Sequence, residues 1–202
     1  MDRRDGVAGV VLAAGTSSRM GRNKLLLQLE GRSVLRRAVD TALASGLDPV
    51  LVVVGHQREH AEAELRGVRC RLVANPDYQN GVNTSLRTGI RAVPESCPAA
   101  VVMLADMPLV SEAMLRTLLE QYRGGSAPLV VSSYEGIDAP PILYDRALFD
   151  ELRVLEGEGC GKKVVKRHSE EALRIRWPAM ALTDLDLPAD VERVQARLRE
   201  GR

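Results

Sequence analysis

The sequence predicts one α/β domain spanning residues 1–202, in which a mostly parallel sheet lies between two layers of helices. Short β-branched runs alternate with amphipathic stretches along the chain, and most of these runs are continuously apolar, as strands covered on both faces should be. No internal repeat, low-complexity tract or linker divides the chain. A repeated strand–helix–strand order places helices on both faces of a parallel sheet, so we expect a single-domain, three-layer α/β/α architecture.

Several short, apolar, β-branched runs are the strand candidates. In an open sheet of this class, ligands bind beyond the carboxyl ends of the strands, so the residues that follow each run are candidates for a functional site. In chain order the candidate strands are Val7–Ala13, Pro49–Gly55, Cys70–Ala74, Ala99–Ala105 and Pro128–Tyr134.

Amphipathic stretches between and after these strands are the helix candidates. Ser33–Ser45 carries an apolar face and stops before Gly46, which favours a helix C-terminus there. Ser111–Tyr122 begins with a serine, a residue type that caps helix N-termini. The last candidate runs from Pro188 to about Arg199, and a proline suits its first turn.

The composition excludes several classes of function. Lys plus Arg is 28 and Asp plus Glu is 27, and a net charge of +1 argues against a dedicated nucleic-acid binder. Cys70, Cys97 and Cys160 are scattered and form no Cys-x-x-Cys pair, which favours reduced thiols. No run approaches the roughly 18 apolar residues of a membrane span, and the first run is interpreted as a strand, not a signal peptide. We therefore expect a cytoplasmic protein without nucleic-acid or membrane partners.

The loop after the first strand, LAAGTSSRMGRNK at residues 12–24, has the composition of an anion-binding site. Five residues separate Gly15 from Gly21, so the loop is neither a P-loop nor the Gly-x-Gly-x-x-Gly dinucleotide motif. Glycines let backbone amides approach an anion, Arg19 offers a planar fork for two phosphate oxygens, and Lys24 offers a point charge. The alternative is a solvated basic loop, but the whole set favours phosphate binding.

Two acidic segments supply candidate metal ligands. Asp106 follows the fourth strand in an otherwise apolar stretch, where a carboxylate is well placed to hold Mg²⁺, a cation that takes oxygen ligands. The alternative is that Asp106 caps the turn before Pro108. Asp184 and Asp186 precede the last helix, and either is a candidate second ligand, with helix capping as the alternative.

Two further segments are candidate anion sites. In Asn75–Ile90 a polar turn precedes helical apolar spacing, so Asn83 and Ser85 are expected at a helix N-terminus, where free amides favour phosphate. Gly157–His168 combines three glycines with four lysines and arginines, which suits a second anionic substrate. The alternatives are an N-cap cluster in the first segment and a surface helix with a flexible start in the second.

With these segments assembled, the chain resembles the nucleotidyltransferase superfamily of molybdenum cofactor guanylyl- and cytidylyltransferases. The resemblance rests on the Leu-Ala-Ala-Gly-x-Ser-x-Arg-Met-Gly-x-x-Lys pattern, on Asp106 within Asp-Met-Pro, and on the terminal Asp-x-Pro-x-Asp segment. Leu-Ala-Ala-Gly, NGVNTSLRTG, and PPILYDRALFDEL followed by GEGCGKK resemble the cytidylyltransferases in particular. The resemblance implies a fold of the nucleotide-diphospho-sugar transferase type with a Rossmann-like sheet.

The resemblance also implies an activity and a set of site residues. The activity is Mg²⁺-dependent transfer of CMP from CTP to the terminal phosphate of molybdopterin, the molybdenum cofactor. It releases pyrophosphate and gives the cytosine dinucleotide cofactor for a molybdenum hydroxylase apoenzyme. Asp106 and Asp186 are the implied metal ligands, and Arg19, Lys24 and Asp106 are the implied catalytic residues. The implied nucleotide-binding residues are Leu12, Ala13, Ala14, Gly15, Arg19, Lys24, Asn83 and Ser85, and the implied acceptor-binding residues are Lys162 and Lys163.

The chain departs from the family pattern mainly on the acceptor side. Ala105 stands where many relatives have glycine, and Cys160 and Lys162 stand where glycine and arginine are frequent. DAPPILY, at residues 138–144, lacks the basic and glycine residues common before its proline. Three alternatives therefore stay open: another phosphorylated acceptor, use of GTP, or a non-catalytic chaperone that binds the molybdenum cofactor.

Overall fold

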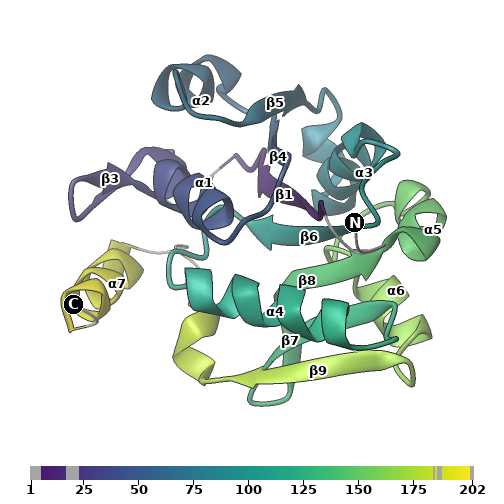
Figure 1. Ribbon diagram of the computed structural model, residues 1–202. Helices are drawn as coiled ribbons and strands as arrows, with labels where there is room; N and C mark the ends of the chain where they lie inside the picture. Colours follow the sequence, from purple (N-terminus) through teal and green to yellow (C-terminus); the bar gives the residue numbers. More distant parts are fainter. Residues whose placement is uncertain (1–5, 17–22, 184, 186–187, 201–202) are drawn as a thin grey trace.

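A seven-stranded sheet forms the centre of the protein (Figure 1). The computed structural model describes residues 6–16, 23–183, 185 and 188–200. The strands of the sheet are β1 Ala8–Ala13, β4 Val50–Val54, β5 Arg71–Ala74, β6 Ala99–Leu104, β7 Leu129–Tyr134, β8 Ile137–Asp145 and β9 Ala172–Trp177. They lie in the order β5, β4, β1, β6, β8, β7, β9, and a separate ribbon pairs β2 (Gln28–Leu29) with β3 (Arg32–Ser33).

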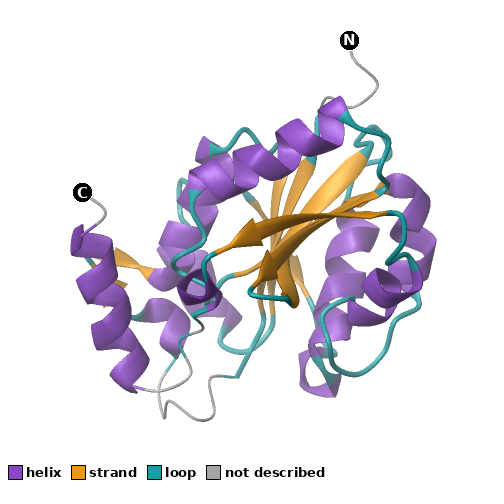
Figure 2. Ribbon diagram, turned by 90° about the horizontal axis from the view of Figure 1, so that it is seen from below, coloured by secondary structure: helices purple, strands orange, loops and turns teal. Residues whose placement is uncertain are grey.

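Helices cover both faces of the sheet (Figure 2). α1 and α4 contribute to the core on one face, and α3, α5 and α6 contribute to the core on the other. No helix among the described residues combines the length and apolarity needed to cross a membrane. The predicted α/β class with a mostly parallel sheet is confirmed. The helices are α1 Val34–Ala44, α2 Arg58–Glu64, α3 Val82–Ala92, α4 Glu112–Gly124, α5 Phe149–Arg153, α6 Lys162–Arg167 and α7 Pro188–Glu200.

Two helix starts are capped by serine hydroxyls, and the sequence predicts the cap at Ser111. The Ser33 hydroxyl accepts a hydrogen bond from the backbone N–H of Arg36 and begins α1. The Ser111 hydroxyl accepts one from Met114 and begins α4. Each cap satisfies an N–H that has no partner inside the helix, so the boundary is set by local chemistry.

The central strand β1 explains why the predicted strands are continuously apolar. Val11 and Ala13 belong to the core beneath α1 and α4, whereas Val10 and Leu12 belong to the core beneath α3 and α6. Successive side chains of a strand point to opposite faces, so a strand with a helix layer on each side has no solvent-facing position. All of β1 is buried accordingly.

The five predicted strands are confirmed as β1, β4, β5, β6 and β7, but the prediction omits β8. β8 runs antiparallel to both β6 and β7 and contains Pro140 and Pro141, a residue type that argues against a central strand. The register with β7 shifts beside these prolines. There the Ser132 hydroxyl donates to the Pro141 carbonyl at 2.7 Å, and the Tyr134 hydroxyl donates to the Pro140 carbonyl at 2.8 Å. Side-chain donors thus supply hydrogen bonds at an irregular part of the ladder.

The prediction also omits β9, the edge strand beside β7. Its residues Leu173, Arg174 and Arg176 are exposed, so the strand lacks the apolar run by which the buried strands are recognised. An edge strand with charged side chains is a common way to discourage pairing with other chains.

The strand order creates a topological switch point between β1 and β6. From β1 the chain proceeds outward to β4 and β5 on one side and returns to β6 on the other side of β1. These four strands are parallel, so their carboxyl ends meet at one edge of the sheet. In doubly wound folds the ligand crevice lies at such a point.

Candidate active site

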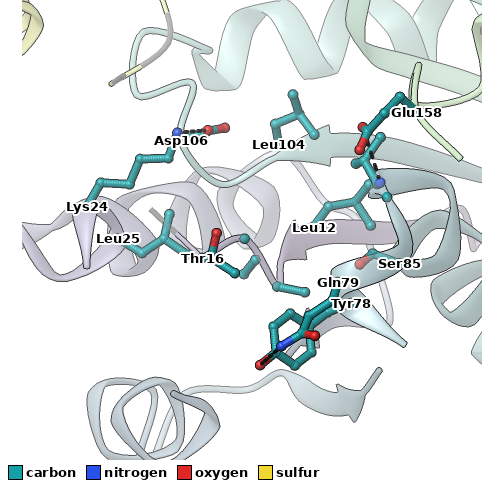
Figure 3. A pocket seen from close by; sticks show the side chains of 15 residues that line it. Leu12, Thr16, Lys24, Leu25, Tyr78, Gln79, Ser85, Leu104, Asp106 and Glu158 are labelled. Atoms are coloured by element: carbon teal, nitrogen blue, oxygen red, sulfur yellow. Dashed lines mark hydrogen bonds and ion pairs between the residues drawn. The ribbon is translucent and has the colours of Figure 1, made fainter. Parts of the chain in front are cut away.

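A pocket of about 350 Å³ opens at the carboxyl ends of β1 and β6 (Figure 3). Its volume falls within the usual range for small-molecule sites. Lys24 and Asp106 meet at one end, and Ser85 and Glu158 lie at the other. The lining residues are Leu12, Ala13, Ala14, Gly15, Thr16, Lys24, Leu25, Tyr78, Gln79, Gly81, Val82, Ser85, Leu104, Asp106 and Glu158.

The loop after β1 contributes most of the predicted nucleotide-binding residues to this pocket. Leu12, Ala13, Ala14 and Gly15 all line it, while Arg19 lies outside the described residues. A Cβ atom added at Gly15 would meet no atom of the described residues within 4 Å. Packing within the protein therefore does not require glycine at this position, and the open space beside its backbone faces the pocket.

Lys24 and Asp106, predicted separately as a phosphate ligand and a metal ligand, form an ion pair. Lys24 Nζ lies 2.5 Å from Asp106 Oδ2, and their side chains are 12% and 22% exposed. Lys24 starts a short 3₁₀ turn, η2 (Lys24–Leu26), in which the Asn23 side chain caps the N–H of Leu25. Asp106 directly follows Ala105, whose N–H donates to the carbonyl of Leu12 at 3.0 Å. The sheet therefore brings two residues distant in sequence into one partly buried charge pair.

This pair bears on the fit of a divalent cation. The Lys24 ammonium lies beside Asp106 in the position that a metal cation would take. In the same way, the Asp106 carboxylate lies beside Lys24 in the position that a phosphate would take. No group of three or more His, Cys, Asp or Glu side chains suited to a metal occurs within residues 6–16, 23–183, 185 and 188–200. One carboxylate nevertheless fits Mg²⁺, which is usually bound through one or two carboxylates plus substrate phosphates.

The second predicted metal ligand cannot be compared with this geometry. Asp184 and Asp186 both lie outside the described residues. Leu185, between them, is buried and donates its backbone N–H to the carbonyl of Asp106 at 3.2 Å. The chain near the last helix therefore reaches the end of β6, although 79 positions of sequence numbering separate Leu185 from Asp106 (185 − 106).

The N-terminal turn of α3 forms the opposite wall, as expected from its polar sequence. Ser85 lines the pocket, and its hydroxyl accepts a hydrogen bond from Asn75 Nδ2 at 2.9 Å. The same Asn75 amide donates to the Thr84 hydroxyl at 2.9 Å. Asn75 follows β5 and is 2% exposed, so a buried amide fixes both hydroxyls. This organising role of Asn75 escapes sequence reasoning because its partners lie 9 and 10 residues along the chain.

Asn83, a predicted nucleotide-binding residue, has a different environment from Ser85. It is 1% exposed and does not line the pocket. Its side-chain amide donates to the carbonyls of Glu156 and Glu158, and its oxygen accepts from the N–H of Gly161. Asn83 thus contacts the glycine-rich segment 157–161, not the pocket interior.

Beside the first pocket, a second one of about 390 Å³ lies between β8 and α6. Its walls include Ala139, Ile142 and Val165. The cations Lys162 and Lys166 also line it, as does Arg174, which is paired with Asp138. Residues four apart on a helix share a face, which explains why these two lysines occur together. Lys163, predicted to bind the acceptor with Lys162, does not line this pocket because it lies on another face of α6, and Lys166 takes that place.

Cys160, in the segment that joins the two pockets, is not suited to act as a nucleophile. Burial raises the pKa of its thiol to about 12; the nearby Asp106 carboxylate adds to the rise and Lys162 opposes it. The neutral thiol predominates at neutral pH, whereas the thiolate is the reactive form. Burial likewise raises the pKa of the adjacent Tyr144, whose hydroxyl has no hydrogen-bond partner among the described residues.

Several pocket residues were not singled out from the sequence, among them Tyr78, Gln79 and Glu158. Tyr78 and Gln79 belong to the 3₁₀ turn η3 (Tyr78–Asn80). Tyr78 packs closely against Gly55, where an added Cβ would lie 2.6 Å from the tyrosine Cβ. Gly55 and Tyr78 are far apart in the sequence, so no local pattern predicts their contact. It can be recognised only once the end of β4 and the turn η3 are seen to be adjacent.

Comparison with known proteins identifies a family and several relatives. Residues 9–172 match the family described as the MobA-like NTP transferase domain. The purine catabolism protein PucB of Bacillus subtilis (strain 168) is 33% identical over 201 residues, covering 93% of this chain and 95% of PucB. The bifunctional IPC transferase and DIPP synthase of Rubrobacter xylanophilus is 39% identical over 93% of this chain, which spans 51% of that protein.

A solved structure is similar over nearly the whole chain. Rv0371c of Mycobacterium tuberculosis H37Rv has a TM-score of 0.84 and 26% identity, covering 96% of this chain and 99% of that one. A structure of Rv0371c in complex with manganese has a TM-score of 0.79, with 95% and 98% covered. The similarity extends to the β8 and β9 region that the sequence prediction omits.

Proposed function

We propose that this chain, which belongs to the family of MobA-like NTP transferase domains and is a nucleotidyltransferase, transfers CMP from CTP to the terminal phosphate of molybdopterin. The observation that carries the proposal is the meeting of Lys24 and Asp106 beside the Leu12–Gly15 loop. A cation for phosphate and a carboxylate for a divalent metal lie at one end of a pocket of nucleotide size. The product is the cytosine dinucleotide cofactor, which a cytoplasmic molybdenum hydroxylase apoenzyme would receive.

The reaction needs no protein nucleophile. An oxygen of the acceptor phosphate attacks the α-phosphorus of CTP and forms the new P–O bond. The bond from the α-phosphorus to the bridging oxygen breaks, and pyrophosphate leaves with that electron pair. The protein therefore contributes alignment and charge neutralisation, which are the main sources of catalysis in this class of chemistry. The neutral, buried Cys160 thiol is consistent with direct transfer.

In this proposal Lys24 and Asp106 exchange partners when substrates bind. Lys24 moves its charge to the β- and γ-phosphates and stabilises the departing pyrophosphate, with Arg19 as the second cation. Asp106 and Asp186 would hold Mg²⁺, which would neutralise phosphate charge at the reacting centre. Before the nucleotide binds, Lys24 and Asp106 neutralise each other. The electrostatic cost of keeping two charged side chains in the partly buried site is therefore small.

The choice of CTP over GTP rests on Ala14. Its small side chain lines the pocket, and an alanine at this position resembles the cytidylyltransferase pattern. The choice of acceptor site rests on the second pocket. Lys162 and Lys166 would bind the anionic group, while the apolar wall formed by Ile142 and Val165 suits the body of the acceptor.

The decisive experiment measures pyrophosphate release in a matrix of nucleotides and acceptors, with and without Mg²⁺. We expect turnover with CTP and molybdopterin, loss of turnover on removal of the metal, and at least a hundredfold loss in Asp106→Ala. A clear preference for GTP would overturn the assignment of the base. Near-normal turnover of Asp106→Ala would overturn the assignment of the metal ligand.

A second candidate is the same transfer to another phosphorylated acceptor, such as a sugar or alcohol phosphate. The diverse names of the relatives and the replacement of basic residues before Pro140 favour keeping it. An acceptor screen at fixed CTP separates the two, because a higher kcat/KM for another phosphate than for molybdopterin selects the alternative. A cofactor chaperone, the remaining class, would bind molybdopterin and release no pyrophosphate.

A further inference from the structure

The segment Gly157–Gly161 lies between the two pockets and has a backbone that ordinary side chains rarely adopt. Glu158, within it, lines the first pocket, and Lys162, directly after it, lines the second. Gly157, Gly159, Cys160 and Gly161 all have positive φ, between 43° and 107°. Left-handed backbone in consecutive residues forms no regular hydrogen-bonded structure of its own. Contacts from elsewhere must therefore hold this segment in place.

Those contacts come from the first turn of α3. The backbone N–H of Asn83 donates to the Gly157 carbonyl at 3.0 Å, and the N–H of Val82 donates to the Glu158 carboxylate at 3.4 Å. At Gly81, where φ is +97°, an added Cβ would lie 2.5 Å from the Gly157 oxygen. The two backbones therefore approach as closely as glycine allows.

The Asn83 side chain makes three further hydrogen bonds in this region. Its Nδ2 donates to the Glu156 carbonyl at 3.0 Å and to the Glu158 carbonyl at 2.8 Å, and its Oδ1 accepts from Gly161 N at 3.0 Å. A primary amide has two N–H donors, so both are used. At 1% exposure, the side chain has no surface left for a nucleotide while the segment is in place.

We propose that Asn83 is a positioning residue that fixes the acceptor-side segment Gly157–Gly161 in register with the nucleotide pocket. The kinetic part of this inference rests on the proposed function. Gly161 is the N-cap of α6, so Asn83 sets where Lys162 begins and where Glu158 enters the first pocket. Its contribution to transfer is the relative placement of acceptor and nucleotide, and it touches neither.

The first test measures backbone hydrogen exchange of residues 156–162 in Asn83→Ala and Asn83→Asp. The alanine removes all three side-chain hydrogen bonds, and the near-isosteric aspartate keeps the acceptor for Gly161 but turns a carboxylate oxygen toward two carbonyls. We expect at least tenfold faster exchange in this segment for both, with the strands unchanged. Ser45→Ala is the matched control, since it removes another buried hydrogen bond, to Ala42, outside both pockets. Wild-type exchange rates in both Asn83 variants would overturn the proposal.

The second test measures KM for each substrate. We expect Asn83→Asp to raise the KM for the acceptor at least tenfold while the KM for CTP changes less than twofold. An equal rise in both values would instead make Asn83 a nucleotide contact and overturn the inference. If the wild-type protein does not use molybdopterin, the proposed function fails, but the exchange experiment still decides whether Asn83 positions the segment.

Discussion

The two halves of the sheet differ in how they build a binding site. Around β1, β4, β5 and β6 the strands are parallel and end at a switch point where residues 12–16 line the pocket. β1, β4 and β6 are almost entirely buried, whereas the edge strand β5 is partly exposed. Around β7, β8 and β9 the sheet contains an antiparallel strand, two prolines and an exposed edge. Side chains of β8 and of the short helix α6 line the second pocket.

In the proposed function this difference separates the two substrates. In the first half, the position proposed for the nucleotide follows from strand order and from the backbone of the loop after β1. In the second half, single replacements such as Cys160 and Lys162 change the chemistry of the pocket without changing the fold. We therefore expect the nucleotide chemistry to be shared broadly among relatives and the acceptor to vary.

The largest expected effect distinguishes the halves by kinetics. Lys24→Ala should lower kcat about 30- to 1000-fold, because losing a group that stabilises transition-state charge costs about 2–4 kcal/mol. Lys162→Ala should instead raise the KM for the acceptor about tenfold, since it removes a binding contact, with the KM for CTP within twofold. Initial rates of pyrophosphate release at varied CTP and acceptor give all three constants.

Lys163→Ala supplies the contrast for that comparison. Lys163 is exposed and lies outside the lining of the second pocket, so its replacement should affect the acceptor less than that of Lys162. A larger effect at Lys163 would show that the acceptor approaches α6 from another side.

The next effect compares one glycine from each half. A Cβ at Gly89, within α3, would lie 2.4 Å from Val10 Cγ1. A Cβ at Gly161, where φ is +82°, would lie 2.5 Å from the Tyr144 hydroxyl. We expect each alanine substitution to lower the free energy of unfolding by about 1–3 kcal/mol, from overpacking at Gly89 and from backbone strain plus overpacking at Gly161. Urea unfolding measures both.

Tyr144→Phe is the matching control for the glycine comparison. It removes a buried hydroxyl that has no partner among the described residues, so alone it should be neutral or stabilising. It should recover part of the loss in Gly161→Ala and none of the loss in Gly89→Ala. Equal behaviour of the two double variants would contradict the assigned contacts.

The smallest effect concerns the ion pair that joins α6 to α5 in the acceptor half. His168 Nε2 lies 2.7 Å from Glu151 Oε1. The hydrogen bond that His168 donates to the Glu151 carboxylate raises the pKa of His168. Partial burial favours a higher pKa for Glu151. The hydrogen bonds that Glu151 accepts from His168 and Arg167 outweigh this effect, so its pKa is lowered. The stabilisation is therefore fullest between the ordinary values of 4.5 and 6.5, and is lost above that window as His168 deprotonates and below it as Glu151 protonates.

Unfolding measured against pH checks this sign. The difference in unfolding free energy between wild type and His168→Asn should be greatest near pH 5.5, stay below about 1 kcal/mol, and shrink by pH 8. His60→Asn, which replaces an exposed histidine of α2, is the matched control for the loss of a histidine. A difference that grows toward pH 8 would contradict the pairing.

Sequence patterns predict the first half of the molecule better than the second. β1 and β6 can be recognised because burial on both faces demands an unbroken apolar run, and Ser111 marks a helix start because capping is local. β8 escapes because Pro140 and Pro141 contradict strand propensity, while the hydroxyls of Ser132 and Tyr134 that donate to their carbonyls lie on the neighbouring strand.

The sequence by itself determined the fold class, the loop after β1 and the identity of Lys24, Asp106 and Ser85 as residues at strand or helix ends. Periodicity, caps and glycine spacing act over a few residues, so they can be recognised along the chain. Only the tertiary structure decided that Lys24 pairs with Asp106, that Asn83 holds Gly157–Gly161, and that Lys166 joins Lys162. Those contacts depend on the order of strands in the sheet and on close backbone approach, which no local pattern encodes.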